Sequence, residues 1–240
     1  MSMQLILALF MVFAGWVSCA SRPPFEWAAL PQSSSDTFLK FIEDQRFKDQ
    51  GVTKVRYRVE TSGFPVGKPL ELWIKHFGTD ERPAKFPTPL VVDEHGKVRW
   101  QADGSESRIY FHSLALAESK YLALFDPTSG QVAFAKIIPF PVIAEGAGGC
   151  RLSLEIASRD AMVLLATAEG FEPGEELATT SKSNGEVIRH KHRFLKDGPI
   201  AGLQPAVIGK DSGDASFTVE GAKCEVTLNY KWGKAARVFQ

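Results

Sequence analysis

The feature that most constrains the fold of this chain is the alternation of apolar and polar residues at every second position. Two segments show it most clearly, and each begins with a cysteine. Their apolar residues are Cys150, Leu152, Leu154 and Ile156 in the first, and Cys224, Val226, Leu228, Tyr230 and Trp232 in the second. Because successive side chains of a β-strand point to opposite faces, the alternation predicts two strands with both cysteines on the buried face.

The same two-residue period recurs in shorter segments from Val52 onward, separated by glycines, prolines and an Asp-Pro-Thr-Ser-Gly turn. The predicted strands lie within residues 55–59, 70–74, 97–100, 109–111, 121–125 and 132–138. Short strands at this spacing, without a long helical pattern between them, predict an all-β protein made of sandwiches.

One short amphipathic helix is predicted ahead of these strands, over residues 36–48. Phe38, Phe41 and Ile42 recur at helical spacing, Asp36 is a suitable N-cap, and Gly51 follows the end. We expect this helix to dock on the first sandwich.

A repeat divides the strand-rich part of the chain in two. Four residues of the first half, Gly63, Phe64, Gly67 and Leu70, recur 107 residues later as Gly170, Phe171, Gly174 and Leu177. A second match, of Gly96 with Gly185, predicts that the first half carries an extra loop over residues 78–95. The shared spacing and turn residues indicate a duplicated domain.

The segment 170–175, Gly-Phe-Glu-Pro-Gly-Glu, resembles a motif of the immunoglobulin-like domains of bacterial envelope and surface proteins, where it leads from one strand into the next. The first copy, residues 63–68, departs from that motif at the proline and at the glutamate. The resemblance covers most of residues 52–232. It implies two tandem immunoglobulin-like β-sandwich domains that serve as rigid modules for spacing, adhesion or binding.

These patterns predict where the domains begin and end. We expect the first sandwich over residues 52–143 and the second over residues 150–240. Between them, residues 144–149 are mostly glycine and alanine and are predicted to form an interdomain hinge.

The N-terminus has the pattern of a signal peptide over residues 1–20. It carries no charged side chain, and its apolar run over residues 5–14 is shorter than the roughly 20 residues of a membrane span. Val17-Ser18-Cys19 resembles a bacterial lipobox, which implies lipidation of Cys19. Cleavage after Ala20 and an uncleaved N-terminal anchor are the alternatives. Residues 21–51 would then hold a tether rich in proline and serine, followed by the helix.

The predicted location is the cell envelope, where the lipid would anchor the protein to a membrane; a soluble secreted or periplasmic protein is the alternative. Once Cys19 is lipidated or removed, Cys150 and Cys224 remain. An even pair in an oxidising compartment predicts a disulfide bond, and two buried free thiols are the alternative.

The densest group of charges is the segment Arg189, His190, Lys191, His192 and Arg193. On a strand the three cations would share one face and the two imidazoles the other. The cations suit an anionic surface or a glycan, whereas a solvated polar face is the alternative. We predict no metal site, because two imidazoles need a third ligand and the other histidines lie in the other domain.

Two tryptophans are further candidates for ligand contact. Trp73 falls on the strand face opposite Leu72 and Ile74, which predicts an exposed ring, and Trp100 precedes a polar turn. Exposed rings stack on sugars or anchor proteins, although packing against a neighbouring loop is the alternative.

The charge balance and the absence of known motifs exclude several classes of function. The 28 basic and 28 acidic side chains cancel, which argues against a nucleic-acid partner. No catalytic or cofactor motif is present, so we expect neither enzymatic activity nor a cofactor. The prediction is a binding, adhesion or structural module that contacts an envelope or surface protein or a glycan. There are two alternatives. One is a two-domain periplasmic chaperone, and the other is a secreted hydrolase, with Asp93 and Glu94 as candidate acids, or its carbohydrate-binding subunit.

Overall fold

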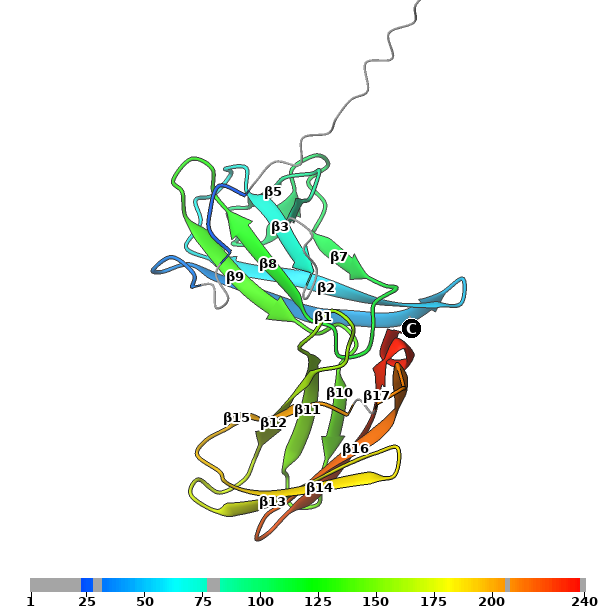
Figure 1. Ribbon diagram of the computed structural model, residues 1–240. Helices are drawn as coiled ribbons and strands as arrows, with labels where there is room; N and C mark the ends of the chain where they lie inside the picture. The colour runs from blue at the N-terminus through cyan, green and yellow to red at the C-terminus, as the bar shows by residue number, and fades with distance from the viewer. Residues whose placement is uncertain (1–22, 28–31, 77–82, 206–207, 238–240) are drawn as a thin grey trace, which may run out of the picture.

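The structure, a computed structural model, describes residues 23–27, 32–76, 83–205 and 208–237. The predicted signal peptide and Cys19 lie outside the described residues. Within them the chain is all-β, as predicted: antiparallel strands account for the regular structure apart from one short 3₁₀ helix, η1 (Lys234–Arg237). The strands form two lobes stacked end to end (Figure 1), and each lobe has its own buried core.

The first lobe contains three sheets with the strand orders β1-β2-β7, β4-β3-β8-β9 and β5-β6. Its strands are β1 (Phe38–Asp49), β2 (Val52–Ser62), β3 (Glu71–His76), β4 (Ala84–Lys85), β5 (Leu90–Val92), β6 (Val98–Trp100), β7 (Arg108–Phe111), β8 (Lys120–Phe125) and β9 (Val132–Ile137). The apolar positions expected to face inward on β2, namely Val55, Tyr57 and Val59, are all buried.

The second lobe contains two four-stranded sheets with the orders β10-β11-β12-β15 and β14-β13-β16-β17. Its strands are β10 (Val142–Glu145), β11 (Arg151–Ile156), β12 (Leu164–Glu169), β13 (Glu176–Ser183), β14 (Glu186–Arg193), β15 (Gly198–Leu203), β16 (Ser212–Glu220) and β17 (Glu225–Gly233). Strand β11, and β17 up to Trp232, alternate between buried and less buried side chains, because each presents one face to the core.

The two lobes share one strand order. The main sheets of the first lobe correspond to those of the second, strand by strand. The order β1-β2-β7 corresponds to β11-β12-β15, and β4-β3-β8-β9 corresponds to β14-β13-β16-β17. The second lobe adds β10 at a sheet edge, and the first adds the β5-β6 pair between β4 and β7. Duplication therefore accounts for the architecture as well as for the sequence repeat.

The helix predicted over residues 36–48 is wrong. Phe38–Asp49 forms β1, which pairs with β2 along its whole length apart from a bulge between Glu43 and Gln45. Leu39 and Phe41 are buried in the first core, whereas Phe38 is 47% exposed. The apolar residues fit both periods over this short stretch, and the long β2 strand beside them provides a ladder of hydrogen bonds that selects the strand.

The repeated Gly-Phe turns occupy equivalent places after β2 and β12. Gly63 and Gly170 have positive φ angles of 82° and 77°, and Phe64 and Phe171 are both buried. A Cβ atom on Gly63 would lie 2.1 Å from the Asp36 carbonyl oxygen, and one on Gly170 would lie 2.6 Å from the Gly149 carbonyl oxygen. Glycine is therefore required at both places by the backbone angle and by the close approach of a neighbouring chain.

The second match of the repeat is wrong. Gly185 lies in the turn between β13 and β14, the equivalents of β3 and β4, but Gly96 lies in the turn between β5 and β6. The extra piece of the first lobe is thus the β5-β6 pair instead of a loop over residues 78–95. Single glycines mark turns without identifying which strands they join, so this match carried too little information.

Residues 144–149 are not a hinge between the lobes. Val142–Glu145 is strand β10, which already pairs with β11 in the second lobe, and the glycines after it form the turn of this hairpin. Gly146 lies against the disulfide, because a Cβ atom there would be 2.8 Å from Cys150 Sγ and 2.9 Å from Cys224 Sγ. Small residues are needed at this turn for packing, and the chain crosses between the lobes earlier, between β9 and β10.

Residues 114–117, in the loop between β7 and β8, pack against both lobes. Leu114 and Leu116 pack in the first core, whereas Ala115 and Ala117 are buried in the second. Ala117 also donates its N–H to the Phe140 carbonyl oxygen at 2.8 Å and accepts a hydrogen bond from the Ile156 N–H at 2.9 Å. Successive residues of this segment, which turns at Leu116 and Ala117, therefore contact the two lobes in alternation.

Cys150 and Cys224 form a disulfide bond, as predicted, with their Cα atoms 6.1 Å apart. The bond joins the start of β11 to the turn before β17 and therefore connects the two sheets of the second lobe. Both cysteines are buried in its core.

Candidate functional site

The charge-dense segment 189–193 lies on β14, at the edge of the sheet β14-β13-β16-β17. A two-residue turn, Asn184-Gly185, connects β13 to β14, and both residues have positive φ angles, 50° and 87°. Such turns match the twist of antiparallel strands and fix their register. Accordingly, β14 pairs with β13 from Glu186 to Arg193 without a shift.

The structure places the cations and the imidazoles of β14 on opposite faces. Arg189, Lys191 and Arg193 are exposed on the outer face of the sheet. Lys191 Nζ lies 2.6 Å from Glu176 Oε1, and this hydrogen bond raises the pKa of the Lys191 ammonium. Within the described part of the chain neither arginine has a carboxylate partner, so two fixed positive charges remain available on the strand.

The imidazoles of His190 and His192 face the space between the two sheets of the second lobe. Their ring centroids are 6.1 Å apart, and His192 Nε2 lies 3.2 Å from the hydroxyl oxygen of Thr179. No group of three or more His, Cys, Asp or Glu side chains among the described residues is arranged to hold a metal ion.

An open groove of about 530 Å³ runs beside these histidines, between the sheet edges formed by β14 and β15. Ile188, His190 and His192 line it on the β14 side, and Ile200 to Gln204 line it on the β15 side. Core residue Phe217 also lines the groove. The groove at this edge of the sandwich is thus apolar at its base and lined by imidazole rings on the β14 side. No sequence pattern predicts the contribution of β15 to this groove, because contacts between different sheets leave no local pattern.

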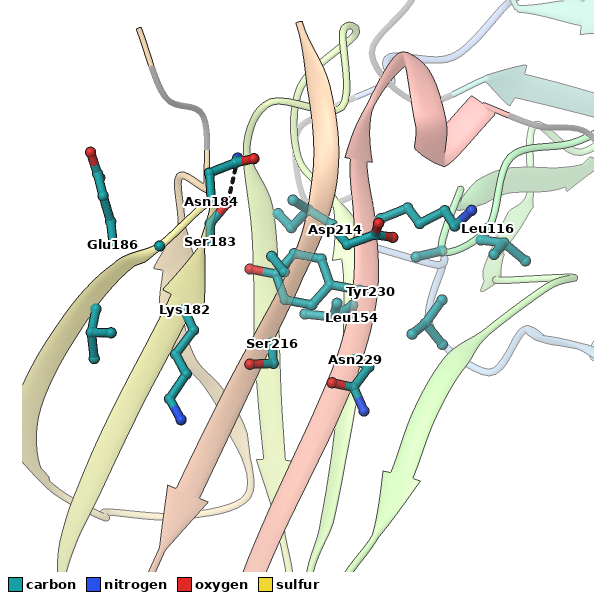
Figure 2. A pocket seen from close by; sticks show the side chains of 17 residues that line it. Leu116, Leu154, Lys182, Ser183, Asn184, Glu186, Asp214, Ser216, Asn229 and Tyr230 are labelled. Carbon is teal, nitrogen blue, oxygen red and sulfur yellow. Dashed lines mark hydrogen bonds between the residues drawn. The ribbon is translucent and has the colours of Figure 1, made fainter. Parts of the chain in front are cut away.

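A larger cavity of about 630 Å³ lies where the second lobe meets residues 114–117 (Figure 2). Leu116, Leu154 and Leu164 supply apolar surface, and Lys182, Glu186 and Asp214 supply polar groups. Tyr230 lies among them, and burial raises its pKa to about 12. The described lining residues include no histidine or cysteine, so this cavity offers apolar contact and hydrogen bonding but no nucleophile paired with an imidazole base.

Trp73 is not the exposed contact that its strand face predicted, because it is only 2% exposed. Phe25 and Trp27, upstream of β1, lie over the outer face of the sheet and form an aromatic cluster with Trp73, Phe125 and Phe134. The alternative, packing against a neighbouring segment, is what the structure shows. That segment is residues 23–27, which fall within the predicted tether.

Trp100 is half-buried and lines an open groove of about 470 Å³ in the first lobe. Phe86, Arg108 and Tyr110 line the same groove, and Tyr110 is 48% exposed. Trp100 therefore keeps part of its ring accessible beside a second aromatic ring and a cation, which is an arrangement suited to a flat polar ligand.

The carboxylate of Asp93 is engaged in the turn between β5 and β6. Its Oδ1 accepts the backbone N–H groups of His95 and Lys97, each at 2.9 Å, and its Oδ2 lies 2.6 Å from Arg99 Nε. The hydrogen bond from Arg99, followed by the one from the Lys97 backbone, lowers the pKa of Asp93 to about 2. A carboxylate held ionised in this way is poorly suited to act as a general acid.

Comparison with known proteins does not place the chain in a family. No family model matches it, and no curated protein is similar to it in sequence. None of the helical structure in the described ranges has the length and apolar composition that a membrane span requires.

Proposed function

We propose that this protein is an exported, lipid-anchored module of a bacterial cell envelope, built of two immunoglobulin-like β-sandwiches, that binds another envelope component without catalysis. The observation that carries the proposal is the edge strand β14, which presents Arg189, Lys191 and Arg193 to solvent beside an open groove. A binding surface on a rigid scaffold of this kind is typical of recognition domains.

The strand order supports the immunoglobulin-like assignment. In each lobe a set of three strands, joined by β10 in the second lobe, belongs to one sheet and a set of four strands to another, and the chain passes through the equivalent strands in the same order. Sandwiches of this family pair two antiparallel sheets of about seven strands in roughly 100 residues.

The disulfide supports export. Cys150 and Cys224 form a buried cross-link of the kind that persists in oxidising compartments and is rare in the cytosol. It agrees with the signal-peptide pattern over residues 1–20 and with the lipobox resemblance at Cys19. The engagement of Asp93 in a turn removes one carboxylate that the hydrolase alternative would need.

Two measurements test the proposal. The first is the intact mass of the protein extracted with detergent from its host, beside a Cys19→Ala variant. We expect a chain that begins at Cys19 and carries acyl groups, and we expect the variant to lose them. A mature chain that keeps residues 1–20 would overturn the lipoprotein assignment.

The second measurement is cross-linking in cells from a photoreactive residue placed at position 189. The matched control places the same residue at position 231, on β17 at the opposite edge of the same sheet. We expect adducts with an envelope component from position 189 and few from position 231. Equal labelling from both positions would refute β14 as the binding surface.

A further inference from the structure

The backbone groups of β14 alternate between two directions. In an antiparallel pair, every second residue exchanges both of its hydrogen bonds with its partner, and the residues between direct their N–H and C=O groups away. Phe194 donates its N–H to the Glu175 carbonyl oxygen at 2.8 Å, which fixes the phase of this ladder. His190 and His192, an even number of residues from Phe194, therefore bond to β13.

The outward-directed backbone groups belong to Val187, Arg189, Lys191 and Arg193. No strand among the described residues pairs with this side of β14. The strand thus offers a row of unpaired donors and acceptors over its eight residues, which is a template for one more strand. The other wall of the groove, β15, is a poorer template, because Pro199 lacks an N–H and the strand is bulged against β12.

The side chains on this row determine what can pair with it. A strand added antiparallel to β14 would place its alternate side chains directly opposite Arg189, Lys191 and Arg193, about 5 Å away. A second copy of β14 would bring cations against cations and is disfavoured. Acidic side chains at every second position would match the row, and the two arginines without carboxylate partners would gain them.

The opposite face of an added strand would look toward the groove beside His190 and His192. Ile188 and Ile200 line this groove with Phe217 at its floor, so small or branched apolar side chains fit there. A partner strand would therefore alternate acidic residues on the outer face with apolar or small residues on the inner face.

From these observations we propose that β14 binds an extended segment of a partner protein as an additional strand of its sheet, with acidic residues opposite Arg189, Lys191 and Arg193. This inference rests on the proposed binding function and specifies the chemistry of the partner. Main-chain hydrogen bonds would supply affinity, and the charge pattern would supply specificity.

The test uses the purified protein from residue 20 onward and labelled synthetic peptides of the length of β14. The probe peptide alternates Glu with Val or Thr. One control peptide has the same composition with the Glu residues grouped at one end, and another replaces each Glu by Lys. We expect the alternating peptide to bind in fluorescence anisotropy, more weakly as salt rises, and each control to bind at least about tenfold more weakly.

Variants separate the charge from the backbone. Arg189→Glu combined with Arg193→Glu should weaken binding about tenfold or more, whereas Lys231→Glu on β17 should leave it unchanged. Val187→Pro removes one outward-directed N–H without breaking a bond to β13 or changing the charge of the strand, and should also weaken binding. Thermal unfolding of each variant shows whether it is folded, so loss of binding by an unfolded variant is not counted.

Amide hydrogen exchange measured by NMR gives the decisive readout. Bound peptide should slow exchange at Arg189, Lys191 and Arg193, and leave His190 and His192 nearly unchanged because their N–H groups are already bonded. Protection elsewhere, equal binding of all peptides, or no binding would overturn the inference. Formation of dimers by the protein alone through β14 would also overturn it. If the peptides fail while position 189 still cross-links a partner in cells, the proposed function stands and this inference falls.

Discussion

Removing the disulfide should destabilise the second lobe far more than the first. Cys150 and Cys224 are 74 residues apart in sequence, and the loop that they close lies wholly in the second lobe. In the chain-entropy model, a loop of this length removes about 15 cal/mol/K from the unfolded state, which corresponds to about 4.5 kcal/mol at room temperature. With a denaturant slope of about 2 kcal/mol/M, the urea midpoint should fall by about 2 M.

The assay is urea unfolding of the wild-type chain and of a Cys150→Ala, Cys224→Ala variant, followed by hydrogen exchange resolved to peptides of each lobe. Wild-type protein with its disulfide reduced serves as a control that keeps both sulfur atoms. Peptides from β11 to β17 should lose protection at lower urea, and peptides from β2 to β9 should change much less. A loss below about 1 kcal/mol in the second lobe, or an equal loss in both lobes, would refute the reasoning.

Three other predictions concern the first lobe. Gly63→Ala should lower the free energy of unfolding by about 3 kcal/mol or more, measured by thermal unfolding, because the new Cβ would meet the Asp36 carbonyl oxygen. The control Gly67→Ala, also at positive φ but with open space around it, should lower it by only about 1 kcal/mol. Phe25→Ala should lower the free energy of unfolding by roughly 2 kcal/mol and shift the fluorescence of the newly exposed Trp73 to longer wavelength. An unchanged spectrum would contradict the burial of Trp73 by Phe25. Arg99→Met should raise the pKa of Asp93 from about 2 toward 3.8 in an NMR titration. Because the folded pKa lies below the unfolded one, this carboxylate stabilises the fold above about pH 4, and its contribution is lost as the pH falls toward 2.

The strands could be predicted wherever one face is buried and the other solvated. The alternation around Cys150 and Cys224 identified β11 and β17, placed both cysteines in the core and predicted their bond. Over residues 36–48 the pattern of apolar residues does not distinguish a helix from a strand. Apolar residues there satisfy the helical and the strand period together, and the choice depends on pairing with β2, which is a contact made in space.

The candidate site could be predicted only in part. The opposed faces of Arg189 and His190 follow from the period of a strand, but the position of that strand at a sheet edge depends on the order of strands. The burial of Trp73 likewise depends on Phe25, which lies 48 residues earlier in the chain. Sequence patterns report which face a side chain occupies, whereas what covers that face is a property of the tertiary structure.

The segment 114–117 also bears on the order in which the molecule assembles. Chains are synthesised from the N-terminus, so this loop emerges before any strand of the second lobe. When β11 forms, the Ala117 carbonyl that accepts the Ile156 N–H is already in place, and so are the methyl groups that close one end of the second core. A fragment that began at Val142 would therefore lack Ala115 and Ala117, which are part of the second core, and we expect it to fold less stably than the same residues in the whole chain.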